Sequence, residues 1–315
     1  MRPGPTHCAN AVFQQPWWLD ALAPGRWDEV TVQREGQTVA RMPYVVRGRP
    51  RARMLTQPPL TQTLGPWLSP RSSDPADALT EELDLQAALA AALPAASMFA
   101  QQFSPAVLTA LPFQRAGYRL DLQYTYRLHE LDDQDALWDG LRGRIRTHIR
   151  RARKQVEIRD DLGLDRFHAV WAKTFERQGL AVPQPLSTLE RLDGACGAHD
   201  ARAMLFAVDE SDRVHAVSYV VWDANVAHYL LGGGDPELRG SGAGHLVIWE
   251  SILQAREHAP VFDFEGSMLQ GVERFFRDFG ARQTPYVRVT RATPAARAAL
   301  ALRAGVRRVR ALSPG

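Results

Sequence analysis

The sequence is poor in the residues that build metal sites and disulfide frameworks. Only two of its 315 residues are cysteines, Cys8 and Cys196, and they are far too distant for a CxxC pair. Two isolated thiols argue against a structural zinc site or a disulfide scaffold, and they suit a reducing compartment. The histidines, among them His215, His228 and His245, show no ligand spacing, so we expect no metal.

Long hydrophobic runs are also missing. The longest is an alanine-rich stretch at residues 85–96, far short of the ~20 residues that span a bilayer. The first 18 residues lack the apolar core of a signal peptide, so we expect a soluble, cytoplasmic protein. The formal charge of +3 tolerates an anionic partner without requiring one. A hydrophobic content of 45% is typical of a globular chain, here long enough for two domains.

Two segments of the chain are repeated. Residues 30–46 (VTVQREGQTVARMPYVV) and 205–221 (LFAVDESDRVHAVSYVV) align without a gap at an offset of 175, and both predict a hairpin that ends in Tyr-Val-Val. Residues 99–119 and 262–282 align at an offset of 163. Each of these predicts a strand, a serine N-cap (Ser104 or Ser267), a helix that ends at a glycine (Gly117 or Gly280), and a further strand.

The repeats predict an internal duplication. We expect a first lobe over residues 1–130 and a second lobe over 131–290, with a C-terminal helix within 291–315 that returns to the first lobe. Periodicity predicts further helices at 137–156, 164–178, 244–258 and 268–279, and a strand at 226–231. The predicted fold class is therefore α/β (α+β), with two tandem lobes that each hold a mixed, mostly antiparallel sheet flanked by helices.

A glycine loop is the most informative motif. The predicted strand at 226–231 leads through glycines into Arg239-Gly240-Ser241-Gly242-Ala243-Gly244 and then into a helix. Small residues let backbone N–H groups turn toward an anion, and the helix N-terminus adds the positive end of its dipole. The sequence lacks GxxxxGK[ST] and the further units of a Rossmann domain. The loop therefore predicts a pyrophosphate site, although a ligand-free helix entry has the same composition.

The spacing R-x-x-G-x-G resembles the acyl-CoA pyrophosphate loop of GNAT acetyltransferases, with Arg239, Gly242 and Gly244 at the matching positions. Most of the chain is similar to FemAB-like proteins, which have two GNAT-like lobes and transfer amino acids from aminoacyl-tRNA to peptidoglycan precursors. The stretches 141–156, 229–244, 263–266 and 271–280 carry this resemblance. One departure is Phe276, because the tRNA-using members have a lysine at that position; Arg277 is a possible substitute.

A basic helix opens the second lobe. Six arginines, His148 and a lysine lie between Arg142 and Lys154, while the apolar residues step by three or four positions. One interpretation is a solvated helix face. The other is a contact with a polyanion: tRNA, the 3′-phosphate of CoA, or a nucleotide-linked substrate.

Two acids follow the predicted cofactor helix. In VFDFE, alternation places Asp263 and Glu265 on one strand face, opposite the two phenylalanines, so we expect a modest pKa shift for Glu265. By the resemblance, this strand parts from its neighbour to admit the acyl chain, which makes Glu265 a candidate base for an acceptor amine. Capping of a helix, or pairing with arginine, is the alternative for both acids. The resemblance also makes Tyr286 a candidate acid for the leaving thiolate, against a packing role.

The combined prediction is an N-acyltransferase without a covalent nucleophile or metal. Acyl-CoA, or aminoacyl-tRNA, is the expected donor. Backbone N–H groups near Leu230–Gly233 are the expected oxyanion donors, and Leu231 and Gly232 within this stretch are expected to contact the cofactor. We expect the amine acceptor near Trp67, Gln102, Tyr229 and Asp263. Gln102 occupies the position of Glu265 in the first repeat. The alternatives are aminoacyl-tRNA-dependent transfer to a peptidoglycan precursor or metabolite, and a non-catalytic duplicate that binds a nucleotide or peptide.

Overall fold

The chain folds into two compact units in a computed structural model, which describes residues 9–49, 52–69, 72–266, 270–299 and 301–302. The glycine-loop unit comprises the residues up to Leu22 together with Tyr124–Pro285, and the companion unit comprises Ala23–Gln123 and the residues from Tyr286 onward. These units differ from the predicted lobes in the place of the N-terminal segment and in the last strand of each sheet. The N-terminal segment up to Leu22 packs with the glycine-loop unit, whereas we expected it in the first lobe.

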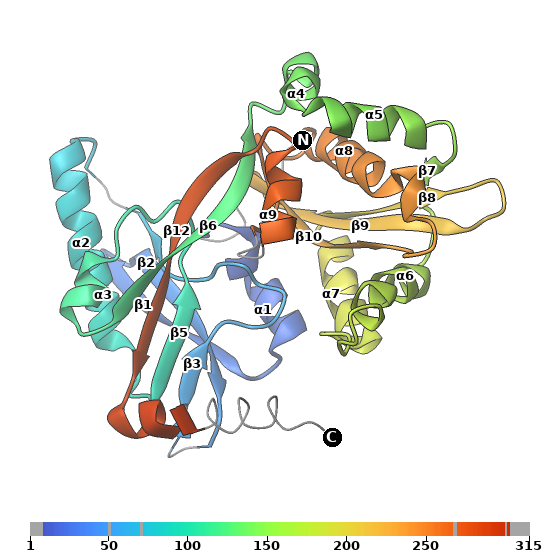
Figure 1. Cartoon of the computed structure of the whole chain (residues 1–315). Coiled ribbons are helices and arrows are strands. Elements are labelled where there is room, and N and C mark those ends of the chain that lie inside the picture. The colour runs from blue at the N-terminus through green and yellow to red at the C-terminus, as the bar shows by residue number, and fades with distance from the viewer. Residues whose placement is uncertain (1–8, 50–51, 70–71, 267–269, 300, 303–315) are drawn as a thin grey trace. The chain divides into compact units, whose positions relative to one another are not determined.

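The companion unit is a mixed sheet covered by two helices. Its strands lie in the order β1-β2-β3-β5-β12, with β4 beside β2. All pairings are antiparallel except β3 with β5. In Figure 1, α2 and α3 lie beside β1 and β2. The elements are β1 (Trp27–Arg34), β2 (Gln37–Arg47), β3 (Met54–Thr56), β4 (Trp67–Leu68), α2 (Pro75–Ala92), β5 (Met98–Gln102), α3 (Leu111–Arg115) and most of β12 (Arg282–Ala292).

The glycine-loop unit has the strand order β7-β8-β9-β10-β11-β6, with β10 and β11 parallel and the other pairs antiparallel. Figure 1 shows α8 and α5 on one side of its strands and α6 and α7 on the other. The strands are β6 (Arg119–His129), β7 (Glu157–Arg159), β8 (Arg202–Val208), β9 (Val214–Trp222), β10 (Val226–Gly234) and β11 (Val261–Asp263). The helices are η1 (Val12–Gln14), α1 (Pro16–Leu22), α4 (Gln134–Gly140), α5 (Gly143–Ala152), α6 (Leu164–Glu176), α7 (Leu186–Ala198), η3 (Arg239–Ser241), α8 (Ala243–Ala255) and α9 (Gln270–Arg277).

The two units repeat one strand order and one set of strand directions. The series β1, β2, β3, β5 and then β12 matches the series β8, β9, β10, β11 and then β6. The last strands are exchanged between the two series. Strand β6 of the glycine-loop series follows α3 of the companion unit in the sequence, and β12 of the companion series follows α9 of the glycine-loop unit. Each of these two strands begins in one unit and ends in the other. The predicted tandem architecture is therefore confirmed, with an exchange of strands that the repeats did not predict.

The hairpin register corrects the gapless alignment of the repeats. Trp27 pairs with Val45, and Arg202 pairs with Val221, so the second strands of the two hairpins are offset by 176 positions rather than 175. Tyr44 thus corresponds to Val220, not to Tyr219. Since the side chains of a strand alternate between faces, this one-residue difference places the two tyrosines on opposite faces. The shared Tyr-Val-Val is a coincidence of composition.

Several predicted helices differ from the observed ones. The helix predicted at 137–156 is two helices, α4 and α5, because Leu141 and Arg142 are extended and glycines 140 and 143 flank them. Ser104 does not cap α3, which begins seven residues later after Ala110. Helix α7 was missed. The predicted N-cap Ser267 and most of the predicted C-terminal helix lie outside the described residues. Within the described part of the chain, no helix is both long and apolar enough to cross a membrane.

Each unit has its own core. Phe262, Phe264 and Phe279 pack with the buried face of α8 in the glycine-loop unit. Phe99, Phe103 and Phe113 form the centre of the companion unit with residues of β2 and α2. Two left-handed glycines, Gly117 and Gly280, follow α3 and α9, as the repeats predicted. They turn the chain into β6 and β12.

Candidate functional site

The site is centred on β10, which separates from β11 near its middle and has a bulge in its pairing with β9 at the same place. Its parallel pairing with β11 covers only Val226 to His228, although β10 continues to Gly234. Its pairing with β9 skips Leu230, which is a β-bulge. Beyond His228, every second backbone N–H group of β10 therefore points to the side on which β11 no longer pairs with it. This is the segment in which the oxyanion donors were expected.

The glycine loop joins β10 to α8 and is held against α5. The turn η3 leads into Gly242, which is left-handed at φ +82°, and α8 begins at the next residue. The Ser241 hydroxyl donates to the carbonyl of Leu238 (2.9 Å) and accepts from the amide of Ala243 (3.2 Å). A side-chain nitrogen of Arg151 donates to the carbonyl of Gly240. These bonds fix the shape of the loop without any ligand.

The loop and β10 line one cleft of about 450 Å³. Tyr229 lies in this cleft with its hydroxyl against Gly232, and burial raises the pKa of Tyr229. Leu231 is buried in β10 and, like Gly240, does not line the cleft. The lining residues include seven predicted site residues: Tyr229, Gly232, Arg239, Ser241, Gly242, Ala243 and Gly244.

The corresponding helix of the companion unit has a different N-terminus. At the start of α2, the Asp74 carboxylate accepts from the amides of Ala76 (2.9 Å) and Asp77 (3.1 Å). A side-chain anion therefore already satisfies the positive end of α2. The N-cap of α8 is Gly242, whose lack of a side chain leaves the helix terminus at the cleft. Of these two helix N-termini, that of α2 is capped by a carboxylate and that of α8 is not.

Two aromatic residues of the cleft were not predicted. His245 lies on the first turn of α8, and its ring stacks on that of His148 from α5 (centroids 4.5 Å apart). Phe275 of α9 contacts His245 from another side (5.2 Å). Burial, and next the charge of His148, lowers the pKa of His245 to about 4, so its imidazole is neutral at physiological pH. No pattern in the sequence predicts this stack, because its members come from three separate helices.

Asp263 is held in a buried polar cluster. Its carboxylate accepts hydrogen bonds from the Thr125 hydroxyl, from Arg127 Nε (2.7 Å) and from the Glu265 amide (2.8 Å). The side chain is completely buried, and its charge is balanced by Arg127. Asp263 therefore pairs with an arginine, as the alternative interpretation of the sequence predicted. Its predicted contact with substrate remains a prediction.

The expected environment of Glu265 was wrong. β11 ends at Asp263, and Glu265 takes a left-handed conformation (φ +54°), so strand alternation does not extend to it. Its carboxyl lies 3.7 Å from His228 Nδ1 and is 15% exposed. Burial, and next the charge of Asp263, holds the pKa of Glu265 well above its usual range, where we had expected a modest shift.

His228 lies beside Glu265, although the sequence analysis assigned it no role because it shows no ligand spacing. It is 1% exposed, and Phe13 covers its ring at a centroid distance of 4.5 Å. Among the described residues, neither ring nitrogen of His228 has a hydrogen-bond partner, and neither does Glu265 Oε1. Burial lowers the pKa of His228 to about 4. Buried polar groups without partners are rare and often mark functional positions.

The remaining predicted site residues belong to the companion unit. Gln102 and Tyr286 meet there, with the Gln102 amide 3.5 Å from the Tyr286 hydroxyl. Trp67 lies on β4, paired with β2, and is half-buried. Tyr286 does not line the cleft of the glycine-loop unit, whereas Tyr229 does.

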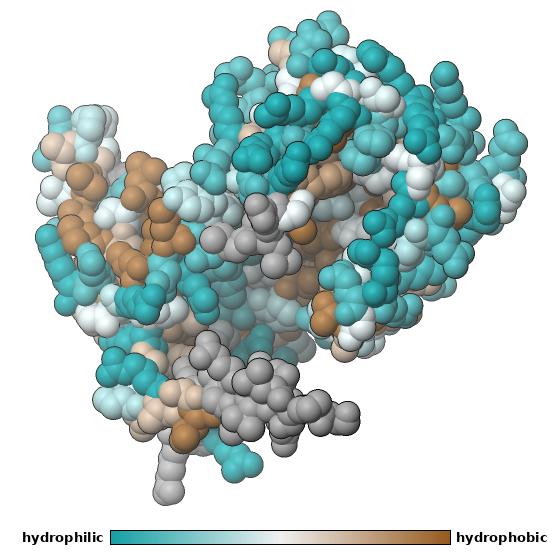
Figure 2. Space-filling view, viewed as in Figure 1, coloured by the Kyte–Doolittle hydropathy of each residue, from teal (hydrophilic) through white to brown (hydrophobic). Residues whose placement is uncertain are grey.

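Some arginines of the basic helix hold the local structure. Arg146 donates to the carbonyls of Trp138, Asp139 and Leu141, which closes the end of α4. Arg153 pairs with Glu250 (2.9 Å). Apart from Arg146, the arginines and the lysine between Arg142 and Lys154 are exposed, and the surface over α4 and α5 is mostly hydrophilic in Figure 2.

Residues 140–277 match the family model of the acetyltransferase (GNAT) domain. None of the curated proteins matches the sequence. Among solved structures, FemX is 14% identical with a TM-score of 0.68, over 90% of this chain and 93% of FemX. The C-terminal domain of a putative lysylphosphatidylglycerol synthetase from Agrobacterium fabrum is 16% identical (TM-score 0.52, 87% and 86% covered). A tandem GNAT protein from the clavulanic acid biosynthesis pathway is 12% identical (TM-score 0.50, 84% and 82% covered).

At these identities the similarity to the solved structures concerns the fold, and the family model covers the segment that holds the glycine loop. The predicted resemblance to GNAT and FemAB-like proteins is confirmed: residues 140–277 match a GNAT domain, and the fold of the chain is similar to that of FemX.

Proposed function

We propose that this protein is an N-acyltransferase that binds an acyl donor in the cleft of the glycine-loop unit and transfers the acyl group to an amine. The observation that carries the proposal is the shared cleft of the bulged strand β10 and the glycine loop at the start of α8. The loop would hold the anionic part of the donor at the helix terminus. The backbone N–H groups of β10 near Leu231 and Gly232 would face the acyl oxygen, where negative charge develops.

The acceptor amine attacks the acyl carbonyl directly in this proposal, so a base must take one proton from nitrogen. Glu265 is our candidate, since it lies where β11 ends beside β10 and its raised pKa suits a base that works near neutral pH. His228 would keep the carboxyl in place. The departing thiolate or ribose oxygen needs a proton, and Tyr229 in the cleft joins Tyr286 as a candidate acid. Gln102, Trp67 and Asp263 remain candidates for acceptor contacts.

Acyl-CoA is the donor we propose first, and aminoacyl-tRNA is the second candidate. The exposed arginines of α5 favour the second, because a polynucleotide would be attracted to them. The acceptor of such a transfer would be a peptidoglycan precursor or another metabolite with an amine.

Calorimetry with acetyl-CoA and with hydrolysis-protected aminoacyl-tRNA tests the proposal. We expect one of them to bind the wild-type protein, and the acylated form of that donor to be consumed in the presence of an amine. The absence of binding by both ligands, at millimolar CoA and at low salt for the RNA, would refute it.

A further inference from the structure

A second hollow of about 590 Å³ lies where the start of α5 meets α9. We call it the arginine pocket, and its lining residues are Arg142, Gly143, Arg144, Glu273, Arg274, Arg277 and Asp278. Four of these are arginines and two are acids, which leaves an excess of two positive charges in one small space. Such an excess attracts anions, most strongly those that accept two parallel hydrogen bonds from a guanidinium group.

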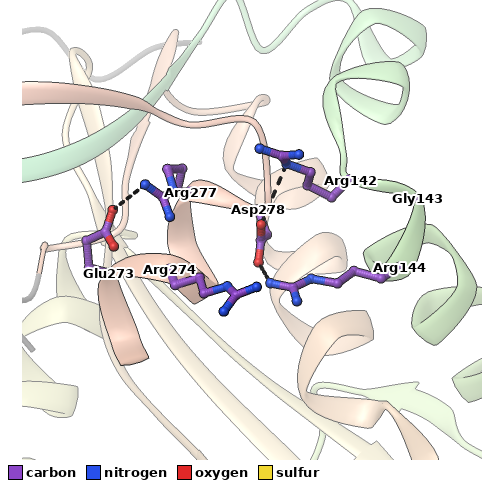
Figure 3. A pocket seen from close by; sticks show the side chains of 7 residues that line it. All are labelled: Arg142, Gly143, Arg144, Glu273, Arg274, Arg277 and Asp278. Carbon is purple, nitrogen blue, oxygen red and sulfur yellow. Dashed lines mark hydrogen bonds and ion pairs between the residues drawn. The ribbon is translucent and has the colours of Figure 1, made fainter. Parts of the chain in front are cut away.

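The acids of the pocket orient its arginines without neutralising all of them. Asp278 is buried and pairs with both Arg142 (3.7 Å) and Arg144, while its carbonyl accepts from the Arg142 amide (2.9 Å). Glu273 pairs with Arg277 (3.5 Å). Within the described residues, Arg274 has no ion pair. Figure 3 shows its guanidinium group pointing toward that of Arg144 rather than toward Glu273.

Two like charges that face each other repel, and an anion between them would offset this repulsion. The arginines are also accessible, because the side chains of Arg142, Arg144 and Arg277 are at least half exposed. Beside its internal ion pairs, the pocket therefore has cationic groups that are open to an external anion.

The arginine pocket is next to the donor cleft along two helices. On α9, Phe275 lines the cleft while Arg274 and Arg277 line the pocket. On α5, His148 meets the glycine loop at Gly242, and Arg144 lies four residues earlier, about one helical turn of 5.4 Å. A donor seated in the cleft thus needs to extend only a short way to reach the arginines.

We propose that the arginine pocket binds a phosphate group of the acyl donor that lies outside the cleft. The inference rests on the proposed function and adds a second anionic contact to it. The phosphate would be the 3′-phosphate of CoA or a phosphodiester of an RNA, since a guanidinium group recognises the same oxygens in both.

The test compares CoA, 3′-dephospho-CoA and hydrolysis-protected aminoacyl-tRNA by calorimetry. Arg274→Gln removes the arginine without an ion pair. Arg166→Gln is the matched control, because Arg166 is a partly exposed arginine on α6 that pairs with Asp212 (3.0 Å). For a CoA donor, we expect the wild type and the control to prefer CoA over 3′-dephospho-CoA by about tenfold, and Arg274→Gln to lose most of that preference.

For an RNA donor, both CoA forms bind equally weakly. Arg274→Gln then weakens tRNA binding, and the slope of log affinity against log salt falls by about one. If the wild type binds a donor and Arg274→Gln keeps the same CoA preference and salt slope, the arginine pocket does not bind the phosphate. That result would overturn this inference and leave the proposed function standing. Binding of neither donor by the wild type would overturn the proposed function, and this inference with it.

Discussion

Two glycines of the loop, Gly242 and Gly244, should respond oppositely to the same substitution. Gly242 has φ +82°, and a Cβ there would lie 2.8 Å from the carbonyl oxygen of His148. A left-handed alanine costs about 1–2 kcal/mol, and an overpacked contact adds about 1–3 kcal/mol. We therefore expect Gly242→Ala to lower the free energy of unfolding by about 2–5 kcal/mol.

Gly244 lies within α8, and a Cβ there meets nothing within 4 Å. Gly244→Ala should leave the stability unchanged or raise it by up to about 1 kcal/mol, since alanine favours a helix over glycine. Because Gly244 lines the cleft, Gly244→Val should keep the fold and weaken donor binding by about tenfold, or ~1.4 kcal/mol. A bulky residue at Gly242, in contrast, would test the contact with His148 as much as the donor.

Urea unfolding followed by tryptophan fluorescence measures the first difference, and calorimetry with the donor measures the second. Equal stability of Gly242→Ala and Gly244→Ala would refute the loop geometry. Unchanged donor affinity in Gly244→Val, with the wild-type affinity established, would refute the placement of the donor against the start of α8.

Two further predictions concern the buried acids. Glu265→Gln should slow turnover by about 10²–10⁴-fold with little change in donor affinity. The pH–rate profile of the variant should also lose its acidic limb, in which the rate falls because the carboxylate becomes protonated. A retained acidic limb would exclude Glu265 as the base. Because the folded-state pKa of Glu265 is raised, its contribution to stability is present below the usual pKa of 4.5 and is lost as pH rises, so Glu265→Gln should gain stability relative to wild type above that pH. Asp263→Asn should lower the free energy of unfolding by about 3 kcal/mol, since Arg127 is only 12% exposed and would lose its partner; a shift under about 0.5 kcal/mol in urea unfolding would contradict the buried pair.

Sequence reasoning predicted the features that depend on neighbouring residues. The hairpins, the glycine at the end of α3 and of α9, and the strand–loop–helix at 226–255 each rest on a few consecutive side chains and on backbone rules that act locally. The glycine loop needs small residues at fixed spacing before a helix, and that requirement is visible in any single sequence. The tandem α/β fold followed from the repetition of these units.

The sequence did not determine which strand pairs with which, nor what the buried acids meet. The partner of β5 lies about 190 residues away in β12, and the partner of β11 about 130 residues away in β6, so neither pairing has a local signal. The Asp263–Arg127 pair depends on the pairing of β11 with β6, and the approach of His228 to Glu265 depends on the pairing of β11 with β10. Glu265 shows both sides of this comparison. Its position after the cofactor helix was predicted from the sequence. Its left-handed backbone and buried carboxyl arise only when β10, β11 and β6 are packed together.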